Sequence, residues 1–113
     1  NIRVRSILGR FLEHHRVFYF GNDGTPELYL ASADWMKRNL LGRVETCFPV
    51  KDPVLFERVY KEGLEIYLRD EKCAYILQQD GSYLPISQDK SRTDDTGHQP
   101  YSSQGALMKH YSA

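Results

Sequence analysis

Residues 16–31 read RVFYFGNDGTPELYLA. The segments 16–20 and 27–31 are rich in apolar and aromatic residues, a composition typical of strands. The six residues between them, 21–26, are turn formers, because Gly and Asn tolerate positive φ and Pro presets its own φ. We therefore predict a β-hairpin with a long loop, and we place it at the centre of the sheet.

Further elements are predicted on both sides of this hairpin. Apolar alternation and β-forming composition predict four more strands, at residues 2–8, 44–50, 72–78 and 82–86. Asp52 and Pro53 supply an N-cap and a first-turn proline for an amphipathic helix that runs to about Arg69. The sequence thus predicts an α/β fold: a mixed sheet with a central β-hairpin and flanking helices, the helix at 52–69 being packed on one face.

Composition narrows the class of protein. The 113 residues suffice for one compact domain. Acidic and basic residues balance at a formal net charge of zero, which argues against a general binder of nucleic acids or anionic membranes. No apolar run approaches the roughly 20 residues of a membrane span. Cys47 and Cys73 are too few for a disulfide framework or metal site, and we interpret them as reduced cysteines of a cytoplasmic protein.

The two ends of the chain carry different signals. The chain opens on Asn1, without an initiator methionine, and runs at once into a predicted strand. We interpret this as a domain excised from a longer protein. Residues 1–86 are the predicted domain. Residues 87–113 are predicted to be a polar linker and a short C-terminal tail, with one or two loose helical turns near the end, because apolar side chains are sparse there.

Four polar side chains fall at one end of the predicted hairpin. His14 and Arg16 enter its first strand, and Ser32 and Asp34 follow its second. Because paired strands bring these positions to one edge, and alternate residues share a face, we expect the four side chains to converge. Arginine matches phosphate oxygens bidentately, and histidine exchanges protons near neutral pH. The set therefore suits phosphoryl transfer, where catalysis is mostly positioning and charge neutralisation.

The order of these residues resembles the half-site of the phospholipase D family, in which His-x-Lys begins one strand and Gly-Ser-x-Asn follows the next. Arg16 stands where Lys is usual, and Asp34 where Asn is usual. Longer blocks are similar to the C-terminal domain of the bacterial polyphosphate kinases: SILGRFLEH at 6–14, LYLASADWM at 28–36 and FPVKDP at 48–53. The resemblance covers about residues 2–86.

This resemblance implies a phospholipase D-like half and a function. The chain would be a fragment, inactive alone, of an ATP:polyphosphate phosphotransferase. That enzyme transfers the ATP γ-phosphate reversibly to inorganic polyphosphate through a phosphohistidine in a preceding, homologous domain. The resemblance implies ATP, ADP and polyphosphate as ligands, Mg²⁺ held by residues outside this chain, and no nucleic acid. It also implies a homo-oligomer in the cytoplasm or associated with the membrane.

The same resemblance assigns roles to the four polar residues. His14 is expected to be catalytic, contacting the nucleotide phosphates and donating or accepting a proton. Arg16, Ser32 and Asp34 are expected to bind phosphate by their place in the half-site. Two other functions stay open: a phospholipase D-type phosphodiesterase half-site, against which the Arg16 and Asp34 departures count, and a non-catalytic oligomerisation domain.

Neighbouring residues have simpler expected roles. Glu13 either orients His14 or is merely exposed, and His15 should point to the opposite face. Trp35 is expected in the core. Arg38 and Arg43 are expected on the surface, where they could line a path for polyphosphate.

Overall fold

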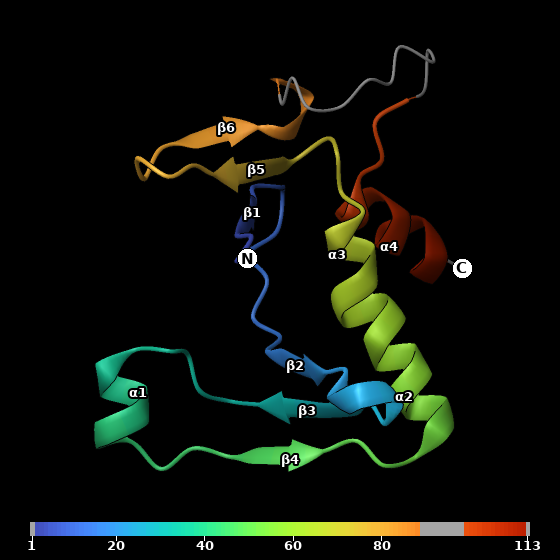
Figure 1. The fold of residues 1–113 in the computed structure, drawn as a ribbon. Coiled ribbons are helices and arrows are strands. Elements are labelled where there is room, and N and C mark those ends of the chain that lie inside the picture. Colours follow the sequence, from blue (N-terminus) through green and yellow to red (C-terminus); the bar gives the residue numbers. More distant parts are fainter. Residues whose placement is uncertain (1, 89–98, 113) are drawn as a thin grey trace. The chain divides into compact units, whose positions relative to one another are not determined.

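The structure is a computed structural model that describes residues 2–88 and 99–112. The chain divides into two compact units (Figure 1): a terminal unit, Asn1–Leu12 with Ile66–Ala113, and a central unit, Glu13–Glu65. Each unit contains one three-stranded sheet, and every strand pairing among the described residues is antiparallel. The α/β class is confirmed, but the predicted mixed sheet is wrong, because the strands form two separate antiparallel sheets.

The central unit is built on the predicted hairpin. Its sheet has the order β2-β3-β4, with β2 at Val17–Phe20, β3 at Glu27–Ala31 and β4 at Cys47–Pro49. The hairpin loop contains a short 3-10 turn, η1 (Asn22–Gly24), in which all three residues have positive φ. Asn and Gly are the residues that adopt this conformation most readily, so the turn chemistry read from the sequence is confirmed.

The long helical segment begins as predicted but is not uniform. The Asp52 carboxylate accepts hydrogen bonds from the backbone N–H groups of Val54 (3.0 Å) and Leu55 (2.9 Å), which caps α2 (Pro53–Tyr60). A π-helical turn, η2 (Lys61–Glu65), follows, and then α3 (Ile66–Leu68) in the terminal unit. The amphipathic pattern predicted a helix here and gave no sign of the π turn.

Within the central unit, α2 packs against one face of the sheet. The ring of Tyr19 lies 6.3 Å from that of Phe56 and 4.9 Å from that of Tyr60, measured between centroids. The expected packing of this helix on a sheet face is therefore confirmed. A second short helix, α1 (Lys37–Gly42), connects β3 to β4, where the sequence predicted a short helix or an ordered loop.

The terminal unit joins strands from both ends of the chain. Its sheet has the order β1-β5-β6, with β1 at Arg5–Ile7, β5 at Ala74–Leu77 and β6 at Tyr83–Pro85. The second predicted hairpin is confirmed, and its turn uses Gly81 at a φ of +85°. A 3-10 turn, η3 (Ile86–Gln88), follows β6, and a last helix, α4 (Ser103–Tyr111), ends the described chain.

The last helix is anchored by buried polar contacts. The Asp70 side chain is fully buried and accepts hydrogen bonds from Cys73 N, Ser103 N and Ser103 Oγ, each at 2.7 Å. Gln104 accepts from Phe11 N (3.0 Å) and donates to Phe11 O (2.7 Å). The expected helical turns near the end are therefore confirmed, but the expectation that they are loose is wrong. Residues 89–98 of the expected linker lie outside the described residues, and the domain boundary at residue 86 stays a prediction.

The apolar core is small. Among the described residues only Leu28, Ala74 and Ile86 are hydrophobic and buried. None of the helices within residues 2–88 and 99–112 has the length and apolar character that crossing a membrane requires.

Candidate functional site

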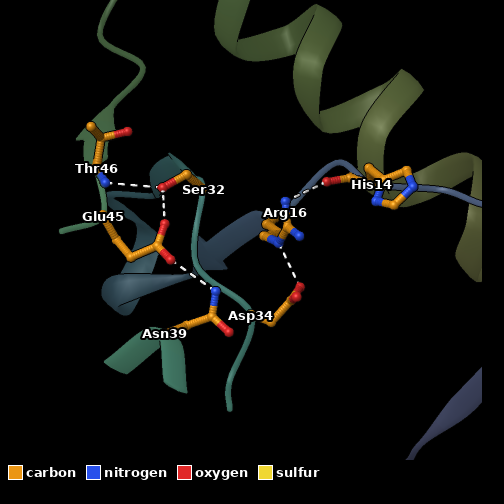
Figure 2. A network of polar contacts seen from close by, with 7 residues as sticks. All are labelled: His14, Arg16, Ser32, Asp34, Asn39, Glu45 and Thr46. Carbon is orange, nitrogen blue, oxygen red and sulfur yellow. Dashed lines mark hydrogen bonds and ion pairs between the residues drawn. The ribbon is translucent and has the colours of Figure 1, made fainter. Parts of the chain in front are cut away.

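Arg16 and Asp34 form the centre of the site. Arg16 stands just before β2, where its Nε donates to Asp34 Oδ1 at 2.7 Å and one Nη donates to the His14 carbonyl at 2.8 Å (Figure 2). Because Ala31 N donates to Arg16 O at 3.1 Å, the pairing of β2 with β3 brings the two ends of the hairpin together. The predicted convergence of Arg16 with Asp34 is confirmed as geometry, and a carboxylate now fixes the direction of the guanidinium.

The two charges stabilise each other. The hydrogen bond from Arg16 holds the pKa of the Asp34 carboxyl below its usual value, and the nearby charges of Arg38 and His14 act in the same direction. The same hydrogen bond raises the pKa of Arg16. Both groups are therefore charged at neutral pH. The second Nη of Arg16 has no partner among the described residues, so it can meet an anionic oxygen.

Ser32 belongs to a neighbouring polar group. Its hydroxyl donates to the Glu45 carboxylate and accepts from Thr46 N at 3.0 Å, while Asn39 Nδ2 donates to Glu45 Oε1 at 2.8 Å (Figure 2). The hydrogen bonds from Ser32 and then from Asn39 lower the pKa of Glu45. In the part of the chain that the structure describes, no hydrogen bond joins Ser32 to Arg16 or Asp34, so its predicted convergence with them is only approximate.

Glu45 and Asn39 were not predicted as parts of this site. Asn39 is 4% exposed, and its Oδ1 has no hydrogen-bond partner within residues 2–88 and 99–112. No periodicity marks either residue, since Glu45 lies near the start of a predicted strand and Asn39 in a predicted short helix. The one sequence signal was their place within short blocks, 38–40 and 43–45, that are similar to the polyphosphate kinases.

His14 is exposed, and its imidazole makes no hydrogen bond to a described residue. It is close enough for its charge to act on Asp34. An exposed imidazole beside a fixed guanidinium can exchange a proton with a bound anion. The catalytic role of His14 stays a prediction.

Glu13 and His15, on either side of His14 in the sequence, lie beside each other. The His15 Nε2 lies 2.9 Å from the Gly63 carbonyl, and its Nδ1 lies 3.6 Å from the Glu13 carboxylate. The His15 imidazole is thus directed to the Gly63 carbonyl, while His15 also lines the cavity beside Arg16 and Asp34, so its orientation to the opposite face stays a prediction. Glu13 is exposed and lies beside His15, so neither of its two expected roles is confirmed.

Trp35 is not in the core. It is 80% exposed and stacks on Phe18, with 5.9 Å between ring centroids and 17° between planes. It follows the end of β3, where the small sheet offers Phe18 as a partner and little else to cover the ring. Trp35 lines an open cavity of about 490 Å³ with His15, Arg16, Val17, Phe18, Ala33 and Asp34.

Arg38 and Arg43 are exposed, as predicted. Their charges lower the pKa of Asp34 and of Glu45, respectively. Both arginines therefore add positive potential beside the site, and their role on a polyphosphate path stays a prediction.

A metal site was also sought among the described residues. The described part of the chain contains no group of three His, Cys, Asp or Glu side chains that could hold a metal ion. The carboxylates nearest Arg16 are already engaged, Asp34 with Arg16 and Glu45 with Ser32 and Asn39. The described residues do not fit a Mg²⁺ site, and no step below is routed through a metal.

Comparison with known proteins points to one family. The family model for the polyphosphate kinase C-terminal domain 2 matches residues 1–97. The polyphosphate kinase of Xylella fastidiosa (strain Temecula1) is 53% identical over 96% of this chain and 15% of its own length. That of Pseudomonas aeruginosa (strain PAO1) is 54% identical over 100% of this chain and 15% of its own length. The chain thus spans about 15% of these relatives.

A solved structure agrees with the sequence matches. The crystal structure of the polyphosphate kinase from Porphyromonas gingivalis is similar, with a TM-score of 0.81 and 35% identity, over 97% of this chain and 16% of that chain. The expected phospholipase D-like class is confirmed by this match. With a family model that covers most of its residues, the chain belongs to the family of the polyphosphate kinase C-terminal domain 2.

Proposed function

We propose that this chain contributes one side of the phosphate-handling site of an ATP:polyphosphate phosphotransferase. The observation that carries the proposal is the Arg16 guanidinium, held by Asp34 beside the exposed His14. A guanidinium whose direction is fixed binds phosphate oxygens without first losing rotational freedom. The names of the relatives supply the substrate class, polyphosphate.

The proposed reaction has two balanced steps. A histidine of a preceding, homologous domain attacks the ATP γ-phosphorus, a P–N bond forms, and the bond to the β,γ-bridging oxygen breaks to release ADP. A terminal oxygen of polyphosphate then attacks the phosphoryl group, and the P–N bond breaks. Arg16 neutralises the transferred group, and His14 donates or accepts a proton at a phosphate oxygen. Ser32 donates its only hydroxyl proton to Glu45, so it would bind phosphate only after giving up that hydrogen bond.

Other properties of the whole enzyme stay predictions. They are Mg²⁺ bound outside this chain, assembly as a homo-oligomer, and a place in the cytoplasm or at the membrane. The inactivity of the isolated chain is also a prediction, since the proposal assigns the phosphorylated histidine to another domain.

A titration with tripolyphosphate and with ATP tests the proposal. We expect saturable binding with the largest chemical-shift changes at His14 and Arg16, and weaker binding in high salt. Arg16→Ala should weaken binding about tenfold, the loss of one charge-assisted contact, and the exposed Arg3→Ala is the matched control. Shift changes confined to other residues would contradict the site. In the longer enzyme, normal polyphosphate synthesis by His14→Ala would contradict the role of that residue.

A further inference from the structure

The residues that lead into β2 are held from two sides. Arg16 faces Asp34, to which its Nε donates at 2.7 Å. His15 faces the π turn η2, where its Nε2 lies 2.9 Å from the carbonyl oxygen of Gly63. The alternation of side chains along an extended segment produces this division. A contact made by His15 therefore acts on the backbone that carries His14 and Arg16.

The π turn makes this contact possible. Its hydrogen bonds span one residue more than those of an α-helix, and such turns recur at functional sites. Gly63 lies within it, and a Cβ at that position would be 3.1 Å from Val17 Cγ2 and 3.8 Å from His15 Cδ2. The absence of a side chain thus lets the helix backbone approach the strand. A carbonyl oxygen only accepts, so His15 Nε2 must carry the proton.

Glu13 completes the arrangement. Its carboxylate lies 3.6 Å from His15 Nδ1 and forms an ion pair with it only while the imidazole is protonated, whereas the neutral ring with its proton on Nε2 keeps the contact with Gly63. The backbone between them carries the His14 carbonyl, which accepts from Arg16 at 2.8 Å. A shift of this segment would therefore move the guanidinium and the exposed imidazole together.

We propose that His15, bonded to the π-turn carbonyl of Gly63, is a positioning residue that sets His14 and Arg16 for phosphate binding. The nature of the ligand rests on the proposed function, whereas the positioning contact itself does not. Loss of the His15 contact should displace the Arg16 guanidinium from its present direction while the fold is retained. The effect should appear in phosphate affinity and in the Arg16 Nε signal, which a contact that only adds stability would not change in fully folded protein.

The first test replaces His15 in the 113-residue chain. His15→Leu keeps the bulk and removes the donor, and His15→Gln keeps an N–H donor near the Nε2 position. We expect the Kd for tripolyphosphate to rise about tenfold in His15→Leu, as expected for the loss of one well-placed charged contact, and to stay within about twofold in His15→Gln. The exposed His110→Leu is the matched control. All are measured where circular dichroism shows complete folding.

The second test changes the helix side of the same contact. Gly63→Ala should also weaken binding and shift the Arg16 Nε signal, and combining it with His15→Leu should add little. Gly21→Ala, where an added Cβ meets nothing within 4 Å, is the matched control. The third test needs no substitution: at pH 8, above the usual pKa of histidine, the ¹⁵N shifts of His15 should show a proton on Nε2.

The outcomes separate the two proposals. A neutral His15 with its proton on Nδ1 would overturn the positioning contact. So would folded His15→Leu and Gly63→Ala proteins with unchanged Arg16 Nε signals. If neither variant folds, the protonation of His15 in the unmodified chain decides. If the unmodified chain fails to bind tripolyphosphate, the proposed function fails, and the Arg16 Nε signals and the His15 tautomer still decide the positioning contact.

Discussion

Replacement of Asp70 by alanine should show how strongly the last helix is anchored to the terminal unit. The Asp70 carboxylate is fully buried and accepts from Cys73 N, Ser103 N and Ser103 Oγ at 2.7 Å each. Alanine removes the acceptor and leaves three donors unpaired. Two of them belong to the segment that begins α4, so the loss should act first on that helix.

The magnitude follows from the number of donors. A buried donor left without a partner costs about 1–3 kcal/mol, and the lower end of that range gives about 3 kcal/mol for the three. A domain of this size has a total stability of only about 5–15 kcal/mol. Since 1 kcal/mol shifts the Tm by about 4–8 °C, Asp70→Ala should melt roughly 12–24 °C lower. Ser103→Ala removes one donor together with its bond and should cost about 1 kcal/mol.

Urea unfolding followed by circular dichroism measures these differences. The variant that combines Asp70→Ala with Ser103→Ala should lose less free energy of unfolding than the sum of the two single losses, because both substitutions remove the same hydrogen bond. Asp80→Ala removes an exposed carboxylate that accepts from Ser82 and should produce the smallest change. A loss below about 1 kcal/mol in Asp70→Ala, or strict additivity with Ser103→Ala, would refute the anchoring role.

Three further predictions concern the central unit. Asp52→Ala should lower the free energy of unfolding by about 1 kcal/mol because it removes the N-cap of α2, and Asp52→Asn should lower it less. Chemical denaturation measures both values, and equal losses would show that the Asp52 side chain does not cap the helix. The pKa values of Asp34 and Glu45 are lowered in the folded state. The two carboxylates therefore add to the free energy of unfolding above the usual carboxyl range near pH 4, and this stabilisation is lost as the pH falls through the lowered pKa values. Denaturation at pH 7 and below pH 4 should show this loss, and a stability that is flat or rises on acidification would contradict it. Arg16→Gln should raise the pKa of Asp34 toward its usual value, as measured by carboxyl ¹³C titration, and an unchanged pKa would mean that another group holds the carboxylate.

Local structure could be predicted from the sequence wherever the residues of one short segment determine it by themselves. The 16–31 hairpin, the Asp52 cap and the turn at Gly81 each depend on backbone preferences or on a side chain that bonds to its own neighbours. The meeting of Arg16 with Asp34 was also predictable, because strand pairing in a hairpin leaves few alternatives for the residues at its ends.

Contacts between distant segments could not be read in this way. The division of the strands into two sheets depends on which strands pair, and alternation reports only which face of a strand is apolar. Trp35 was expected in the core because its ring is large and apolar, whereas the small sheet provides only Phe18 to cover it. The group of Ser32, Asn39 and Glu45 likewise forms across separate elements.

The sequence by itself therefore determined the hairpin, the capped helix, the family and the four polar positions at one end of the sheet. These features follow from backbone preferences, side-chain alternation and the identity of short blocks. Only the tertiary structure decided that Asp34 fixes Arg16 while Glu45 fixes Ser32, and that a π turn brings Gly63 to His15. Such hydrogen bonds depend on distances of a fraction of an ångström between segments far apart in the chain, which residue order does not encode locally.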